Sequence, residues 1–342
     1  VRGDTVRLIP SKEGRRLDMD TIARSIAALP ETRSVRARFE VSQPEVLTAE
    51  LSGLGIKELV SEFSTPYSCC EPRVTNIQTA AKALDGTIIP AGNRFSLNAA
   101  LGARTEDRGY VAAPQIAGGK LEDAVGGGVS QVSTTLYNAA FFAGLDLEAH
   151  TPHSFYISRY PMGREATLSM GGPELIFKND WDAAILMSVT AGDNDVTVRF
   201  FSTKLGRRVE TTTGEPRDYV EPEVEEVFDP SLEPGTREVE QESGGAGFTI
   251  DYTRTVYQND KVRSERTFTW TYSPKNAYIK VGPEATPTPD TDGDDDAPPS
   301  GTTTGSSSGA TTAPAPTQAP TTQADPTPSP SAGGAAPPPP LP

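Results

Sequence analysis

The sequence predicts a multi-domain protein of the α+β class, and the order of its patterns carries this prediction. In the middle of the chain, helical patterns come first and several strand patterns follow, an order typical of an α+β domain. Beyond this region, extended alternating runs predict a small all-β module, which is followed by a low-complexity tail. We therefore expect four parts, which span residues 1–60, 61–207, 220–282 and 283–342.

Residues 1–60 combine strand patterns with one helical pattern. Residues 34–41 alternate at period two, as a half-buried strand does. Ile22, Ile26 and Leu29 recur at helical spacing, which gives a helix one apolar face. Because this α/β segment starts abruptly, we interpret it as the second half of a domain.

The central domain, residues 61–207, contains two predicted helices followed by strands. The first helix has an apolar face made of Ile77, Ala80, Ala81 and Leu84. The second helix is expected from Ser130 to Ala143, because Gly144 is a typical residue just beyond a helix end. We expect strands at residues 154–160, 184–189 and 196–201.

The β module is expected in residues 220–282. Its first part, the acidic stretch 221–235, is interpreted as a linker. Farther on, aromatic residues alternate with threonines around Trp270, and a turn at Asn259 and Asp260 joins two extended runs into a hairpin.

The tail, residues 283–342, has no Lys or Arg and almost no large apolar residue. Such a segment cannot bury enough apolar surface to offset its chain entropy, so we expect it to be disordered. Its Thr, Pro and Ser content is typical of extracytoplasmic stalks.

Composition argues against two classes of partner. The formal net charge is -15 and no basic stripe occurs, so we expect no nucleic-acid partner. No apolar run reaches the roughly 18 residues that a membrane-spanning helix needs. Because the chain opens at Val1 and not at Met, we expect a signal peptide or anchoring helix upstream, which would be the protein's link to a membrane.

Several stretches of the central domain occur together in a distinctive order: FSTPY, RVTNIQTAAKALDGTIIPAGNRFSLNAALGARTEDRGYVAA, GGGVSQVSTTLYNAAFFAGL, PHS, PMGREAT and LIFKND. This combination, at about residues 61–206, closely resembles the VanW family of bacterial cell-envelope proteins. Residues 1–60 resemble the end of the peptidoglycan-binding-like domain that often precedes VanW, and residues 220–282 resemble a G-five domain. The resemblance implies an extracytoplasmic location, with peptidoglycan as the partner, and we expect no cofactor.

The resemblance also implies chemistry at the start of the second helix. Some VanW domains are linked to L,D-transpeptidase activity, with a cysteine at the start of this helix as the candidate nucleophile. Here Ser130 stands at that position. A helix N-terminus activates a thiol, whereas a serine hydroxyl needs a general base. His153 is the base that we nominate, and Glu165 would orient its imidazole as the third member of a triad.

Ser130 also has a structural interpretation. A serine after three glycines and before a helix is often an N-cap, and here it would accept a hydrogen bond from the backbone N–H of Ser133.

Cys69 and Cys70 are adjacent and are the only two cysteines. They could be structural thiols or a vicinal disulfide, and this interpretation comes first. A second interpretation makes one of them a relocated nucleophile opposite His153. A third is a zinc site with His150 and His153, but adjacent cysteine ligands are uncommon, so we expect no metal.

Further motif residues are candidates for substrate binding. Gly126, Gly127 and Gly128 would allow close approach of a substrate backbone. Arginines in the motifs could bind peptide carboxylates, or form structural ion pairs with nearby acids such as Glu106. These candidates are Arg73, Arg104, Arg164 and, for amide recognition, Gln131.

Two functions therefore stay open. The first is a peptidoglycan-associated protein with L,D-transpeptidase-like acyl transfer on cell-wall stem peptides. The second is a catalytically inactive cell-wall binding or scaffold module that has lost the family's cysteine. The serine at position 130 favours the second, while the glycine loop and His153 favour the first.

Overall fold

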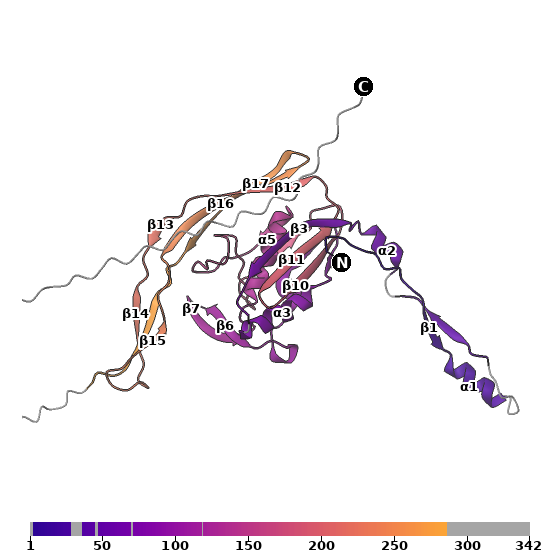
Figure 1. The fold of residues 1–342 in the computed structure, drawn as a ribbon, viewed down its shortest axis with the longest axis horizontal. Coiled ribbons are helices and arrows are strands. Elements are labelled where there is room, and N and C mark those ends of the chain that lie inside the picture. Colours follow the sequence, from indigo (N-terminus) through magenta and orange to yellow (C-terminus); the bar gives the residue numbers. More distant parts are fainter. Residues whose placement is uncertain (1–2, 29–35, 45–46, 70, 118, 286–342) are drawn as a thin grey trace, which may run out of the picture. The chain divides into compact units, whose positions relative to one another are not determined.

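The computed structural model describes residues 3–28, 36–44, 47–69, 71–117 and 119–285 (Figure 1). Disorder is expected for residues 283–342, and those from 286 onward lie outside these ranges. None of the helices in the described ranges is both long and apolar enough to cross a membrane.

The first part of the chain contains two strands and two helices. Strand β1 pairs antiparallel with β2, and both strands are exposed along their whole length. The predicted helix is present, although Leu29 lies outside the described residues. The elements are β1 (Gly14–Leu17), α1 (Met19–Ala28), β2 (Phe39–Ser42) and α2 (Thr48–Gly53).

A four-stranded sheet with two helices packed against it forms the centre of the fold (Figure 1). Its strands follow the order β3, β11, β10, β4, and every neighbouring pair is antiparallel. Helix α5 packs against β3 and β11, and helix α3 packs against β10. The elements are β3 (Glu58–Pro66), α3 (Pro72–Leu84), β4 (Ile88–Ile89), α5 (Ser130–Phe142), β10 (Ile185–Ala191) and β11 (Asp195–Ser202).

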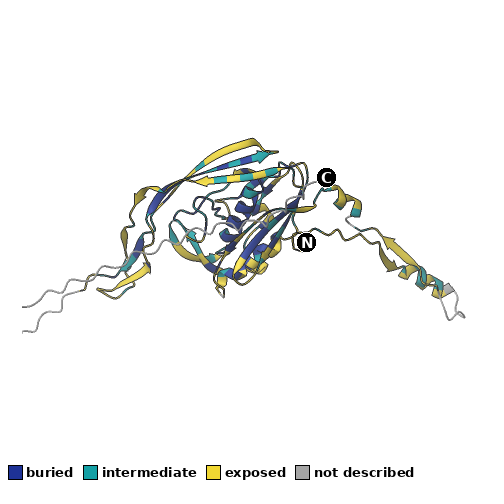
Figure 2. Cartoon of the chain, turned by 45° about the horizontal axis from the view of Figure 1, so that its top comes forward, coloured by how far each residue is buried: buried dark blue, intermediate teal, exposed yellow. Residues whose placement is uncertain are grey.

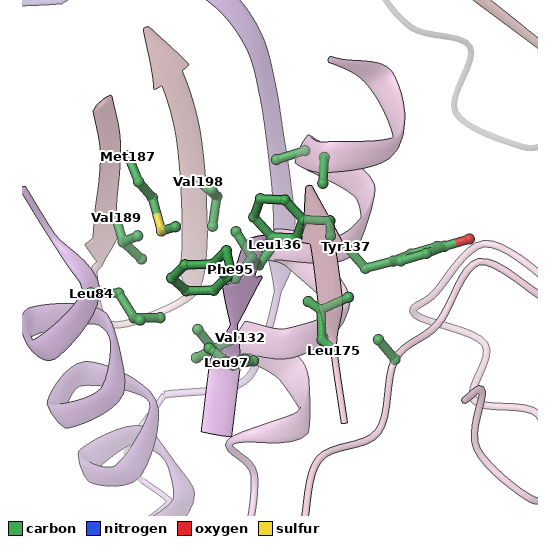
Figure 3. Packing of buried hydrophobic residues seen from close by; sticks show 14 of the residues in the cluster. Leu84, Phe95, Leu97, Val132, Leu136, Tyr137, Leu175, Met187, Val189 and Val198 are labelled. Atoms are coloured by element: carbon green, nitrogen blue, oxygen red, sulfur yellow. The ribbon is translucent and has the colours of Figure 1, made fainter. Parts of the chain in front are cut away.

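Apolar side chains from the helices and the sheet meet in one core (Figure 3). Leu84, Leu136 and Met187 come from α3, α5 and β10, and each is 0% exposed. In Figure 2 the buried residues concentrate in this central part of the fold. Every residue of α5 from 131 to 141 is buried, so this helix needs packing partners on more than one side.

Smaller elements surround the sheet. Strands β5, β9 and β8 form a three-stranded sheet, and β6 and β7 form a hairpin. Their bounds are β5 (Arg94–Ser96), α4 (Leu97–Leu101), the 3-10 helix η1 (Glu106–Arg108), β6 (Ala112–Ala117), β7 (Lys120–Val125), β8 (Asp146–Ala149) and β9 (Ile176–Lys178).

The strand predicted at residues 154–160 is wrong. Residues 150–175 contain neither helix nor strand, and a turn closes where the N–H of Tyr160 bonds to the carbonyl of Ile157 at 3.0 Å. Phe155 and Tyr160 are 7% and 3% exposed, so the apolar residues that suggested a strand pack individually against other elements.

The all-β region begins at Arg207, where β12 pairs with β16, which is earlier than the sequence predicted. The central pair is the long hairpin β16–β17, in which β16 also pairs with both β12 and β13, and a second sheet has the order β14, β18, β15. The bounds are β12 (Arg207–Thr213), β13 (Arg217–Val220), β14 (Val224–Phe228), β15 (Arg237–Gln241), β16 (Gly247–Gln258), β17 (Lys261–Tyr272) and β18 (Ala277–Val281).

Two predictions for this region have different outcomes. The hairpin turn is confirmed: Asn259 and Asp260 have φ angles of 51° and 60°, and positive φ at both positions is what a tight hairpin turn requires. The linker predicted at residues 221–235 is wrong, because β14 lies within it and pairs parallel with β18. All residues of β14 are exposed, so its glutamates stay in water while its backbone pairs.

The hairpin supplies part of the packing that α5 needs. Tyr252 of β16 belongs to the central core, and its hydroxyl lies 3.0 Å from that of Tyr137 on α5. Arg254 donates hydrogen bonds to the carbonyls of Phe141 and Leu145, at 2.7 and 3.0 Å. Phe141 lies in the last turn of α5, where backbone acceptors lack partners within the helix, and Leu145 follows shortly after the helix ends.

Candidate functional site

A cavity of about 980 Å³ lies where several segments meet. Its walls come from the starts of α3 and α5, the β6–β7 hairpin and the loop 150–175. Trp270 of β17 and residues between Ser273 and Tyr278 complete the lining. Of the residues nominated from the sequence, the cavity is lined by Arg73, Gly128, Ser130, Gln131 and His153.

His153 and Glu165 form a buried pair beside the cavity. The two side chains come from opposite parts of the loop 150–175, and they are joined by a short contact between Nδ1 of His153 and Oε2 of Glu165. His153 is 5% exposed and Glu165 is 0% exposed. The structure therefore brings together the base and the orienting acid nominated from the sequence.

The second oxygen of Glu165 has its own donor. Tyr272 donates from its hydroxyl to Oε1 of Glu165 at 2.6 Å, and the same hydroxyl accepts from the N–H of Gly163 at 2.7 Å. Burial, together with the adjacent carboxylate, raises the pKa of Tyr272 well above its ordinary value. The phenol therefore stays protonated and remains a donor.

The imidazole of His153 is held from other directions as well. Its ring stacks on Tyr160, with the centroids 5.6 Å apart and the planes 13° from parallel. Its backbone carbonyl accepts from Nε1 of Trp270 at 3.0 Å. Nε2 has no hydrogen-bond partner among the described residues, and His153 is one of the residues that line the cavity.

Ser130 is the first residue of α5 but does not cap the helix. The N-cap is Val129, and the N–H of Ser133 bonds to the Val129 carbonyl at 3.2 Å, so the predicted capping bond is wrong. The hydroxyl of Ser130 instead accepts from the N–H of Leu168 at 3.1 Å. No hydrogen bond joins Ser130 to His153 in the part of the chain that the structure describes.

The glycine loop before α5 packs closely against its neighbours. A Cβ atom at Gly127 would overlap the carbonyl of Ala113, and one at Gly128 would lie 2.8 Å from Cβ of Arg73. Gly128 also has a φ of +91°, which residues with a side chain rarely adopt. Gly126 and Gly127 do not line the cavity, so close packing against neighbouring residues, and not ligand contact, explains these two glycines.

Gln131 and Arg73 form a second polar group at the cavity. Gln131 is 0% exposed, and its amide donates to the carbonyl of Pro66 at 2.8 Å and to Oγ1 of Thr65 at 3.1 Å. Its Oε1 accepts from Nη2 of Arg73 at 2.5 Å. Burial lowers the pKa of Arg73, and the nearby Arg159 lowers it further.

Comparison with known protein families places this site in context. A family described as "VanW like protein" matches residues 72–201, and a family described as "G5 domain" matches residues 209–284. The chain carries a VanW-like domain followed by a G5 domain. Both domains expected from the sequence are thereby confirmed, while the peptidoglycan-binding-like domain at residues 1–60 stays a prediction.

Two curated proteins are similar to part of this chain. The uncharacterized protein YoaR of Bacillus subtilis is 35% identical over 156 residues, which cover 46% of this chain and 50% of YoaR. The Vancomycin B-type resistance protein VanW of Enterococcus faecalis is 29% identical over 141 residues, which cover 39% of this chain and 50% of that protein. The chain therefore spans about half the length of these relatives.

Among solved structures, the G5 domain of an IgA1 protease resembles part of this chain. The two share 24% sequence identity over 23% of this chain and 89% of that structure, with a TM-score of 0.15.

The remaining candidates of the VanW-like domain lie away from the cavity lining. Arg104 donates to Oδ1 of Asn98 at 2.7 Å and to the carbonyl of Gly102 at 3.0 Å. The guanidinium of Arg164 lies over the ring of Phe142, 5.3 Å from its centroid. Both arginines therefore contact other parts of the domain and do not line the cavity.

Cys69 and His150 do not line the cavity beside His153. Cys69 is exposed and does not line the cavity, and Cys70 lies outside the described residues. His150 is half-buried, stacked on Tyr137 at 4.2 Å. Among the described residues, no group of three or more His, Cys, Asp or Glu side chains is placed to hold a metal ion.

The G5 domain adds residues that the sequence did not identify as part of the site. Trp270 and Tyr272 were interpreted only as alternating strand residues, yet both bond to the His153–Glu165 pair. Lys275 and Tyr278 line the cavity from the same domain. The alternation of aromatic residues in the sequence indicates that these residues lie on a strand. It does not indicate which part of the protein that strand contacts.

Proposed function

We propose that this protein acts in the cell envelope, where its cavity binds a carboxylate-bearing stem peptide of peptidoglycan. One observation carries the proposal. The described lining of the cavity has three basic side chains, Arg73, Arg159 and Lys275, against one acidic side chain, Glu71. In a chain with a net charge of -15, this local excess of positive charge favours an anionic ligand.

The basic side chains are available to a ligand. None of the three takes part in an ion pair in the ranges that the structure describes. Nε of Arg73 is buried and has no hydrogen-bond partner there. A carboxylate would pair with the Arg73 guanidinium, whose orientation is already fixed by Gln131.

The cavity also suits a short peptide in size and surface. Its volume of about 980 Å³ lies at the upper end of ordinary ligand sites. Ser130 and His153 add polar groups, while Ile116 and Phe155 add apolar surface. The VanW-like and G5 domains, together with a relative named for vancomycin resistance, support a place in the envelope.

Titration calorimetry with a tetrapeptide muropeptide tests this proposal. The full chain should bind the free acid and bind the amidated peptide more weakly. Arg73→Gln should weaken binding of the free acid by about tenfold to a hundredfold, since a charged hydrogen bond is lost. Arg217→Gln is the matched control, because Arg217 pairs with Asp251 in the G5 domain. Absence of binding, or equal affinity for acid and amide, would contradict the proposal.

A second candidate is acyl transfer on the same stem peptides, and the His153–Glu165 pair favours it. Glu165 holds Nδ1 of His153, which leaves Nε2 to accept a proton. A serine hydroxyl or a cysteine thiol would attack a stem-peptide carbonyl while its proton passes to Nε2. The amide C–N bond would then break, and the leaving amine would take that proton. The amine of a second stem peptide would attack the resulting ester or thioester, and its proton would return through Nε2 to the released serine or cysteine. Because no hydrogen bond links Ser130 to His153 in the described part of the chain, binding is our first proposal.

Incubation of the protein with tetrapeptide muropeptides separates the two candidates. Acyl transfer predicts cross-linked or exchanged products that disappear in His153→Gln. Ser130→Ala and Cys70→Ala would then identify the nucleophile, since only the variant that lacks it becomes inactive. Binding without products in the wild-type protein leaves the binding function alone.

A further inference from the structure

We infer that the G5 domain completes the VanW-like site, with Tyr272 and Trp270 acting as positioning residues for the His153–Glu165 pair. Both residues lie on β17, and both bond directly to a member of the pair. The inference deepens the proposed function, but its structural part can be tested without a ligand.

Tyr272 fixes the carboxylate. Glu165 is 0% exposed, and one of its oxygens contacts His153 while the other accepts from Tyr272 at 2.6 Å. The phenol is itself held by the N–H of Gly163 at 2.7 Å. With both oxygens bound, the carboxylate has one orientation, and through it the imidazole has one orientation too.

Trp270 fixes the backbone that carries the imidazole. Its indole N–H donates to the carbonyl of His153 at 3.0 Å, and the N–H of Ser273 donates to the carbonyl of Ser154 at 2.7 Å. The loop 150–175 has no helix or strand of its own. Its position at His153 therefore depends on these bonds from the G5 domain.

The same segment of the G5 domain continues into the wall of the cavity. Lys275, Asn276 and Tyr278 line it beyond the end of β17. The VanW family match ends at residue 201, so a VanW-like domain alone would lack the tyrosine, the tryptophan and this wall. The functional unit is the pair of domains.

Nitrogen-15 NMR of the histidines in the full chain tests the inference. Tyr272→Phe removes the hydroxyl and keeps the ring, and the His150→Phe spectrum assigns the remaining histidine, His153. We expect the Nδ1–H proton of His153 to exchange with solvent about tenfold faster in Tyr272→Phe, the factor that corresponds to one lost hydrogen bond. Tyr257→Phe is the matched control, because Tyr257 donates to an exposed carboxylate, Glu210, near the other end of the hairpin.

An unchanged His153 signal in Tyr272→Phe would overturn the inference. If that variant does not fold, Trp270→Phe replaces it, because Trp270 is only half-buried and the substitution removes its bond to the His153 carbonyl. Faster exchange of the His153 proton would again support the inference, and an unchanged signal would overturn it. Muropeptide binding measured in parallel separates the two proposals. A changed signal without binding by any form supports the inference and contradicts the proposed function, whereas wild-type binding with an unchanged signal does the reverse.

Discussion

His150 should make the protein less stable as the pH falls. Its ring stacks on Tyr137 with centroids 4.2 Å apart and meets Phe268 edge-on at 5.6 Å, and its Nε2 lies 3.2 Å from the hydroxyl of Tyr252. Burial lowers the pKa of His150 to about 4, and the nearby positive charge of Arg266 contributes. The imidazole is therefore neutral in the folded protein near pH 7.

The size of this loss of stability follows from the difference between the pKa values of His150 in the folded and unfolded protein. In the unfolded chain the pKa of the imidazole returns to its ordinary value of 6.5. Between the two pKa values the unfolded state binds a proton that the folded state does not, so the free energy of unfolding falls as the pH drops through this range. The full loss for this one group is about 3 kcal/mol, reached below about pH 4 and absent above about pH 7.5.

Urea unfolding of the wild-type protein and of His150→Phe, followed from about pH 8 to about pH 4, measures this effect. Phenylalanine keeps the stacking on Tyr137 but cannot take a proton. The variant should be about 1 kcal/mol less stable at the upper pH, because the bond to Tyr252 is lost, and should overtake the wild type at the lower pH. Carboxylates affect both proteins alike and cancel in the difference. Parallel pH profiles for the two proteins would refute the reasoning.

Two other changes test the packing of the fold, each by urea unfolding. Arg254→Met removes the buried guanidinium that donates to the carbonyls of Phe141 and Leu145, so the free energy of unfolding should fall by about 2 to 4 kcal/mol, while the exposed Arg208→Met should change it by less than about 0.5 kcal/mol. Similar losses for both variants would contradict the role given to Arg254. Gly127→Ala forces a Cβ onto the Ala113 carbonyl and should cost about 3 kcal/mol, whereas Gly245→Ala meets no atom within 4 Å and should be nearly neutral. A stable Gly127→Ala protein would show that the loop can move.

Local patterns in the sequence predicted the helices and the hairpin. The apolar spacing around Leu136 and the Asn259–Asp260 turn act over a few residues, so their structural result can be inferred without knowing the rest of the fold. Strand β14 could not be inferred in this way. Its partner β18 lies far along the chain, and its exposed glutamates resemble those of a linker.

For the candidate site, too, only residues that lie close together in the sequence could be predicted. The sequence indicated His153, Glu165 and the start of α5, because motif residues lie close together there. It did not indicate Tyr272, which bonds to Glu165 across 107 positions of sequence. It also assigned Ser130 a capping bond within its own helix, whereas the hydroxyl bonds to Leu168, a residue brought near only by the fold.

The placement of Tyr252 in the central core has a consequence for the order of folding during synthesis. Helix α5 emerges from the ribosome long before β16 and β17, yet its core includes a side chain of that hairpin. A nascent chain that ends near residue 206 would expose the Tyr137 face of α5 to water until the hairpin arrives. Final packing of the VanW-like domain is thus a late event, and it waits for the strands that also carry Trp270 and Tyr272.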